Sequence, residues 1–159
     1  MAFTVPKVEH INPFLNATKE TFSTMVNMEA KPSSKPYLKQ GEGTTYDVSG
    51  VIGLSGDAKG SISISFPRTT VLKVVSEFLG EKVTSLDDDV SDAVGEIINI
   101  VAGAAKKDLT SFNITISLPT VVMGAGHKVQ QPKDVMSMII PFKCDAGEFD
   151  VAINLKSNS

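Results

Sequence analysis

The chain has 159 residues, of which 42% are hydrophobic and 21% charged, and its net charge is −3. This composition is typical of a single globular domain over residues 1–159, whose core is stable without disulfides or a structural metal. The mild acidity and the absence of tryptophan argue against nucleic acid or an anionic membrane as partners. Because no apolar run could span a bilayer and residues 1–7 do not resemble a signal peptide, we expect a cytoplasmic protein.

The first half of the sequence predicts a helix followed by strands. Apolar residues recur at helical spacing over residues 13–30, and Asn12 with Pro13 matches an N-cap and a first helical position. Three segments then have strand character, and the last of them alternates serine with apolar residues: 37–40, 44–54 and 60–66. A short helix is predicted from residue 67 or 68 to residue 79, where Gly80 ends it.

The second half repeats this order. Acidic residues open a long helix over about residues 88–109, as the helix macrodipole favours. Strand patterns return in three segments: 113–123, 135–144 and 148–156. The sequence therefore predicts an α/β protein of the α+β type. Its largely antiparallel sheet should have about six strands, with two long helices packed on one face and one short helix.

The second long helix carries an unusual polar stripe. Its apolar residues gather on one side, which should face the sheet, and four residues follow the opposite side at spacings of four, three and four: Asp92, Glu96, Asn99 and Gly103. An ordinary solvated helix surface is one interpretation. However, asparagine is a mediocre residue for a helix interior, and glycine there costs about 1 kcal/mol relative to alanine. A flat helix face with one carboxylate and one amide favours docking to another macromolecule.

The chemistry available to Glu96 and Asn99 is narrow. No nucleophile with a partnered base accompanies them, and no third ligand for a transition metal is near, since His10 and His127 are far away in sequence. A carboxylate can pair with a lysine of a partner, and a carboxamide can orient a water molecule. Phosphoryl transfer needs mainly positioning and charge stabilisation, so an amide that orients water can be sufficient for it.

The spacing Asp92-x3-Glu96-x2-Asn99, with Pro119 about twenty residues later, resembles the signature of the CheC/CheX/FliY family of chemotaxis phosphatases. The similarity to CheX-type members covers most of the chain, and its other segments are 9–14, 60–66 and 78–80. This resemblance implies a CheC/CheX-like fold. It also implies a phosphatase that hydrolyses the phosphoryl-aspartate of a phosphorylated CheY-type response regulator in chemotaxis or two-component signalling.

The resemblance also implies a role for each residue of the stripe. Glu96 would pair with the active-site lysine of the regulator, and Asn99 would orient the attacking water. Asp92 and Gly103 would support docking. The regulator would supply Mg²⁺, so this chain would need no cofactor of its own, and a homodimer is implied. The alternative is a non-catalytic adaptor that binds a response regulator or a flagellar-switch component through the same helix.

Several other residues receive structural interpretations. Glu9 and Asn12 repeat the Glu-x-x-Asn spacing, but Pro13 favours a helix cap at Asn12 over a second site. The glycine-rich segment 124–127 is interpreted as a connection between strands, and Cys144 as a packing residue of an apolar strand. Pro141 predicts an edge position or a bulge, because proline cannot donate to a strand ladder.

Overall fold

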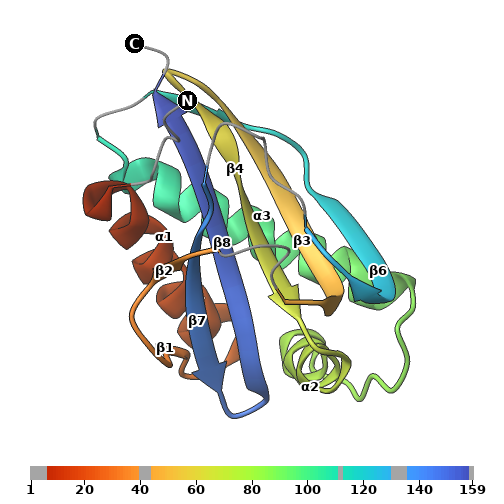
Figure 1. Ribbon diagram of the computed structural model, residues 1–159. Coiled ribbons are helices and arrows are strands. Elements are labelled where there is room, and N and C mark those ends of the chain that lie inside the picture. The colour runs from red at the N-terminus through yellow and green to blue at the C-terminus, as the bar shows by residue number, and fades with distance from the viewer. Residues whose placement is uncertain (1–6, 40–43, 111–112, 130–135, 158–159) are drawn as a thin grey trace.

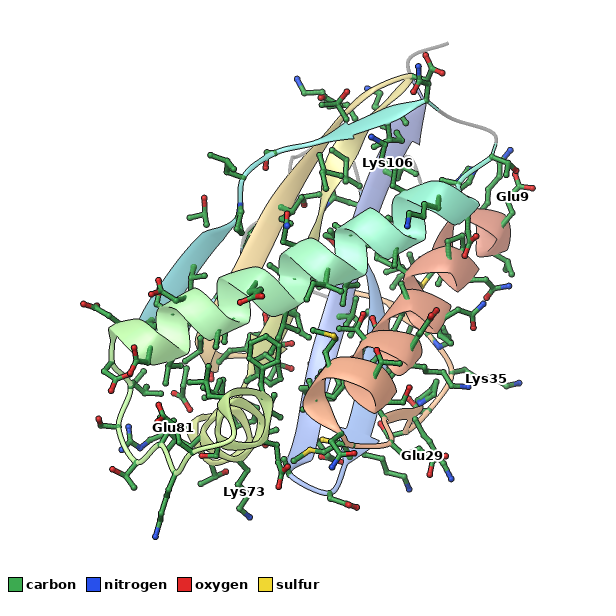
Figure 2. The ribbon with its side chains drawn as sticks, turned by 180° about the vertical axis from the view of Figure 1, so that it is seen from behind. Glu9, Glu29, Lys35, Lys73, Glu81 and Lys106 are labelled. Atoms are coloured by element: carbon green, nitrogen blue, oxygen red, sulfur yellow. The ribbon has the colours of Figure 1, made fainter. Side chains whose placement is uncertain are left out.

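The computed structural model describes residues 7–39, 44–110, 113–129 and 136–157. Three α-helices lie on one side of a sheet: α1 (Val8–Thr21), α2 (Arg68–Leu79) and α3 (Asp88–Asp108). Figures 1 and 2 show α1 and α3 side by side across one face, with α2 at one end. The predicted arrangement of two long helices and one short helix is therefore confirmed. None of the described helices is long and apolar enough to cross a membrane.

The sheet is antiparallel in every described pairing and has eight strands, where the sequence predicts about six. The strands are β1 (Lys31–Pro32), β2 (Tyr37–Leu38), β3 (Tyr46–Gly56), β4 (Ala58–Phe66), β5 (Ile114–Ile116), β6 (Thr120–His127), β7 (Met138–Cys144) and β8 (Gly147–Ser157). Their order is β1-β7-β8-β4-β3-β5, with β2 also on β7 and β6 also on β3. Residues 40 and 135, which two predicted strands included, lie outside the described ranges.

One of the two additional strands arises because the predicted strand 113–123 is interrupted. The pairing of β5 ends at Ser117, because the Gly53 amide donates to the serine hydroxyl at 2.8 Å. The Ser117 amide still donates to the Gly53 carbonyl at 2.9 Å. Pro119 has no amide hydrogen with which to continue the ladder. The chain resumes as β6, which runs as far as His127, so the predicted glycine-rich connection at residues 124–127 is instead the end of a strand.

The other additional strand, β1, lies with β2 along the outer side of β7. Pro141 falls between them, because β1 pairs with residues 142 and 143 and β2 with residues 138 and 139. The Pro141 carbonyl accepts from the Ser33 amide at 2.8 Å on that same side. Pro141 is therefore not on an edge strand, but its missing amide hydrogen faces the gap between two short strands, where no ladder partner is required.

The first helix begins earlier than the sequence predicts. Lys7 is the N-cap of α1, so Asn12 is inside the helix and the prediction that it is a cap is wrong. Pro13 removes one hydrogen bond near the start of α1, and its buried ring contributes apolar contact in exchange. At its other end α1 continues into a π-helical turn, η1 (Phe22–Val26), which ends at Asn27 with φ 60°.

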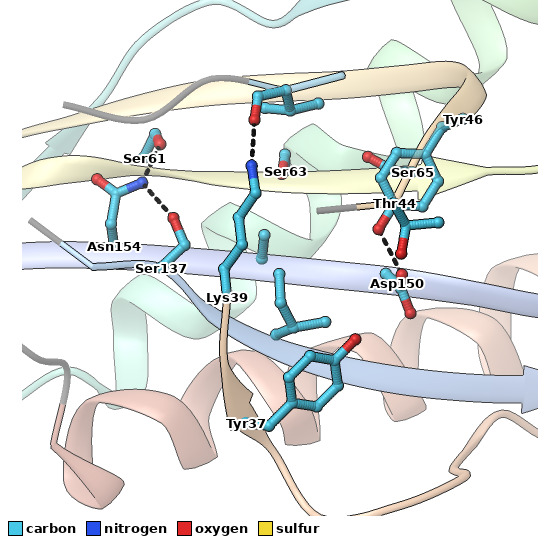
Figure 3. A pocket seen from close by; sticks show the side chains of 13 residues that line it. Tyr37, Lys39, Thr44, Tyr46, Ser61, Ser63, Ser65, Ser137, Asp150 and Asn154 are labelled. Atoms are coloured by element: carbon cyan, nitrogen blue, oxygen red, sulfur yellow. Dashed lines mark hydrogen bonds between the residues drawn. The ribbon is translucent and has the colours of Figure 1, made fainter. Parts of the chain in front are cut away.

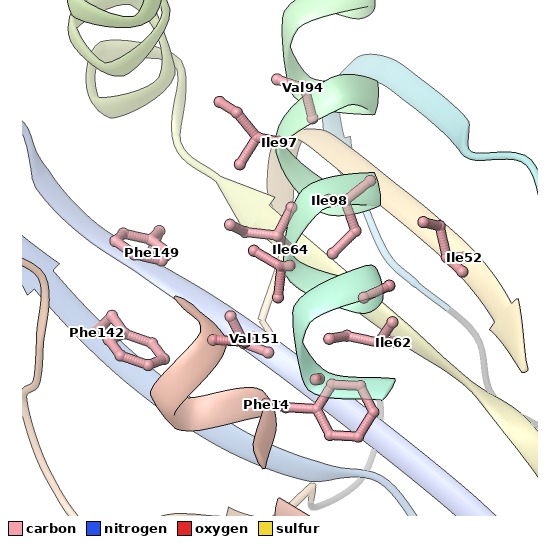
Figure 4. Close-up of a cluster of buried hydrophobic side chains, with 14 of the residues drawn as sticks. Phe14, Ile52, Ile62, Ile64, Val94, Ile97, Ile98, Phe142, Phe149 and Val151 are labelled. Carbon is pink, nitrogen blue, oxygen red and sulfur yellow. The ribbon is translucent and has the colours of Figure 1, made fainter. Parts of the chain in front are cut away.

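The core fills the space between the helices and the sheet. Figure 4 shows Ile62 and Ile64 of β4 facing Ile97 and Ile98 of α3. All four side chains are buried. Gly50 of β3 allows α3 to come close, because a Cβ atom there would lie only 3.1 Å from the side chains of α3 above it. This packing fixes the distance and the rotation of α3 relative to the sheet.

Candidate functional site

The candidate site is built on α3, and local sequence holds this helix in place. Asp87 caps it by accepting a hydrogen bond from the Val90 amide at 3.2 Å. Acidic residues occupy the first turn and lysines the last, as the macrodipole favours. The inward side of the helix is fully buried, and its members are Val90, Val94, Ile97, Val101 and Ala105. Burial of this side fixes the rotation of α3 about its axis. The opposite side of the helix therefore faces outward from the protein.

The polar stripe lies on this outward side. Asp92, Glu96 and Asn99 are exposed, and Gly103 is partly exposed. Glu96 and Asn99 are three residues apart, so their Cβ atoms lie about 5 to 6 Å from each other. Among the described residues, neither side chain has a hydrogen bond or an ion pair. The carboxylate and the amide are therefore available to a partner molecule.

A shallow groove of about 340 Å³ borders the stripe. Ser91, Asp92, Gly95, Glu96 and Asn99 of α3 form one side. The other side is formed by Leu118, Pro119 and Val121, at the interruption between β5 and β6 and the start of β6. The interrupted strand thus brings Pro119 beside the pair of polar residues, although about twenty residues separate them in the sequence.

Four residues of the groove are not among the site residues predicted from the sequence: Ser91, Gly95, Leu118 and Val121. Gly95 forms part of its floor, because a Cβ atom there would lie 3.5 Å from Val121 and 3.6 Å from Pro119. Leu118 is 88% exposed at the rim, so its apolar side chain is accessible to a molecule that covers the groove. In the sequence, the Leu118-Pro119 pair within a strand pattern is the signal that could have indicated this part of the groove. It can be interpreted only once the strand is known to be interrupted there.

Gly103 is on the stripe but outside the groove. In the described part of the chain, apart from its neighbours in sequence and its own helix backbone, no atom lies within 4 Å of a Cβ atom built on Gly103, so no described contact requires glycine there. Its cost of about 1 kcal/mol relative to alanine in a helix interior is therefore not offset by any internal contact. A role for Gly103 in close approach by a partner stays a prediction.

The remaining candidate groups do not form a second reactive centre. The described residues include no group of three or more histidine, cysteine or acidic side chains that could hold a metal. Cys144 packs against the core, and burial raises the pKa of its thiol, which disfavours the nucleophilic thiolate. Glu9 and Asn12 are exposed on α1, and Glu9 lies 3.5 Å from the His10 ring. His127 contacts the Ser49 hydroxyl at 2.7 Å and the Gly124 carbonyl at 2.8 Å.

The fold and the site together define an α+β protein whose candidate functional surface is an outward helix face with an unpaired carboxylate and amide. The family model described as chemotaxis phosphatase CheX matches residues 48–143. The chain therefore belongs to the CheX family, as the resemblance of its sequence implies.

Individual relatives match nearly the whole chain. The CheY-P phosphatase CheX of Thermotoga maritima is 29% identical over 150 residues, which cover 92% of this chain and 96% of that protein. The crystal structure of a CheC-like superfamily protein from Shewanella sp. PV-4 is 39% identical, with a TM-score of 0.89 over 96% of this chain and all of that one. The CheX of a CheX-CheY-BeF3-Mg²⁺ complex from Borrelia burgdorferi is 28% identical, with a TM-score of 0.81 over 95% of this chain and all of that one.

Proposed function

We propose that this protein is a phosphatase that hydrolyses the phosphoryl-aspartate of a phosphorylated CheY-type response regulator. The observation that carries the proposal is the unpaired Glu96 and Asn99 beside an open groove, on a chain of the CheX family. The Thermotoga relative is a CheY-P phosphatase. The Borrelia relative was crystallised with CheY, BeF3 and Mg²⁺.

Asn99 would act by positioning water. Its amide offers a donor and an acceptor, which can hold one water molecule in line with the phosphorus of the aspartyl phosphate. The water oxygen attacks the phosphorus, and the bond from phosphorus to the aspartyl oxygen breaks with its electron pair going to the aspartate. The products are the aspartate carboxylate and inorganic phosphate, which keeps both hydrogens of the water. The Asn99 amide takes no proton in this step and acts only by position.

Glu96 would act by docking and orientation. Its exposed carboxylate can pair with the lysine of the regulator's active site, which fixes where the neighbouring Asn99 enters. Asp92, one turn before Glu96, would add negative charge to the same docking face, and Gly103 would leave the face flat. Mg²⁺ would be bound by the regulator, where it neutralises charge on the phosphoryl group.

The activity is tested by phosphate release from the phosphorylated response regulators encoded in the same genome. The wild-type chain should accelerate release from one of them, and Asn99→Ala should abolish the acceleration while binding persists. Lys73→Met, on exposed α2 surface away from the groove, is the matched control. Binding without any acceleration by the wild-type chain would contradict the proposal and favour the adaptor alternative.

We also propose that the protein forms a homodimer in the cytoplasm. Strand β6 pairs with β3 on one side only, among the described strands. Its Val122 and Met123 are 42% and 37% exposed, which suits pairing with another strand. Light scattering after gel filtration should report a dimer, and Val122→Lys should shift it toward the monomer. A wild-type monomer at micromolar concentration would contradict this part of the proposal.

A further inference from the structure

The face of the sheet that carries no helix holds a second feature, a cavity of about 170 Å³. Because strand side chains alternate, the isoleucines of β4 face the helices and Ser61, Ser63 and Ser65 face the other way. Their partners on the neighbouring strand β8 are Asn154, Ala152 and Asp150. Tyr37, Lys39, Tyr46 and Ser137 complete much of the wall, as Figure 3 shows.

At one end of the cavity a buried acceptor has no donor. Asn154 is only 3% exposed, and its amide nitrogen donates to the Ser61 hydroxyl at 2.8 Å and toward the Ser137 hydroxyl at 3.5 Å. Its carbonyl oxygen, Oδ1, is buried and has no hydrogen-bond partner among the described residues. Buried polar atoms are almost always paired in folded proteins. This end of the cavity therefore suits a molecule with an N–H or O–H donor.

In the middle of the cavity an ammonium group lacks an anion. Lys39 Nζ donates to the Val129 carbonyl at 2.6 Å, which leaves two of its three hydrogens for other acceptors. It has no ion pair with a carboxylate in the described part of the chain. Burial and the nearby charge of Lys128 lower the pKa of Lys39. A ligand carboxylate beside Lys39 would stabilise its charged form and so oppose both effects.

The far end of the cavity is closed by an acid and a phenol. The Tyr46 hydroxyl donates to the Asp150 carboxylate, and Figure 3 shows Lys39 between this pair and the group formed by Asn154 and Ser137. The lining therefore contains a cation and an anion, together with a free acceptor. A cavity of this size exceeds the 150 Å³ that accommodates benzene in another protein, so it admits a molecule of about six to eight non-hydrogen atoms.

We propose that this cavity binds a small zwitterionic amino acid. The ligand's carboxylate would accept from Lys39, and its ammonium group would donate to Asn154 Oδ1. The serine hydroxyls of β4 would supply further hydrogen bonds along one side. This site is on the opposite face of the sheet from Glu96 and Asn99, so the inference does not depend on the proposed phosphatase activity.

Isothermal titration of the full chain with glycine, L-alanine and L-serine tests the proposal. At least one of the three should bind with one-to-one stoichiometry. Propionate supplies the carboxylate alone, ethylamine the ammonium alone, and glycerol only hydroxyls, so each should bind at least tenfold more weakly. Equal binding of propionate or glycerol would overturn the assignment of a zwitterion. If none of the three amino acids binds, the proposal is also overturned.

Two variants locate the binding. Lys39→Met keeps the aliphatic stem but removes the ammonium, and it should weaken amino acid binding at least tenfold. Ala152→Leu should fill the cavity and abolish binding, and circular dichroism verifies that it is folded. Lys59→Met, an exposed lysine on β4 outside the lining, should bind like wild type. If Lys39→Met binds as tightly as Lys59→Met, the ligand is elsewhere and the proposal fails, whether or not Ala152→Leu folds.

Discussion

Gly95 of α3 lies against Pro119, so that a Cβ atom at position 95 would be 3.6 Å from the proline ring. This contact joins the helix that carries Glu96 and Asn99 to the interruption between β5 and β6. It places the helix stripe and the Leu118 rim on either side of one groove. The site is therefore formed jointly by α3 and by the interruption between β5 and β6.

A larger side chain at position 95 should close the groove. Gly95→Leu would place several atoms where Pro119 and Val121 already lie, so we expect at least a tenfold loss of kcat/KM for phosphate release. Gly95→Ala is the matched control, because its methyl would make ordinary contacts and would improve helix propensity by up to about 1 kcal/mol. Denaturant titration should show Gly95→Ala at least as stable as wild type. Equal activity of Gly95→Leu and wild type would show that phosphate release does not require an open groove.

Leu118 should contribute binding energy and little stability. Its side chain is 88% exposed, so Leu118→Ser removes almost no internal contact and should leave the free energy of unfolding within about 0.5 kcal/mol of wild type. If the regulator covers Leu118, the same change should weaken binding by about 1 to 2 kcal/mol, or roughly five- to thirtyfold in Kd. Surface plasmon resonance with the regulator measures this. An unchanged Kd would place Leu118 outside the interface.

The sequence predicts the stripe more completely than the groove. The positions of Asp92, Glu96 and Asn99 follow from the period of one helix, whose apolar side identifies its polar side without any other part of the fold. The groove depends on Pro119 reaching Gly95, and this contact is set by where β5 ends and by how closely α3 packs on Gly50. Neither property is local, so a pattern along the chain cannot reveal it.

The prediction for the start of α1 is wrong for a different reason: the local rule is valid, but it does not decide the structure. Asn12 followed by Pro13 matches a helix start, yet the helix begins at Val8. Four residues of the longer helix are buried, and their burial favours it: His10, Ile11, Pro13 and Phe14. Tertiary packing thus outweighs the one hydrogen bond that proline removes.

Asp150 should make the stability of the fold depend on pH. Burial raises the pKa of this carboxyl above its ordinary value, while the Tyr46 hydroxyl opposes the shift. The folded state therefore binds the proton more tightly than the unfolded state does, and Asp150 contributes less to stability as pH rises from about 4 through the folded-state pKa.

Asp150→Asn removes this titration and keeps an acceptor for Tyr46. Denaturant titrations at pH 4 and pH 7 should therefore show a larger gain, or a smaller loss, from Asp150→Asn at pH 7 than at pH 4. Asp145→Asn, an exposed acid in the turn between β7 and β8, is the control and should show no such difference. If Asp150→Asn instead stabilised the protein more at pH 4 than at pH 7, the folded state would lower the pKa of Asp150.

The most direct test of the phosphatase mechanism measures Asn99→Ala twice, for binding to the regulator carrying BeF3 and Mg²⁺ and for phosphate release under single-turnover conditions. The proposed role predicts a Kd within about threefold of wild type together with a loss of accelerated release of at least a hundredfold, because orientation of water contributes to the reaction and not to docking. Release by Asn99→Ala at the wild-type rate would contradict the central claim.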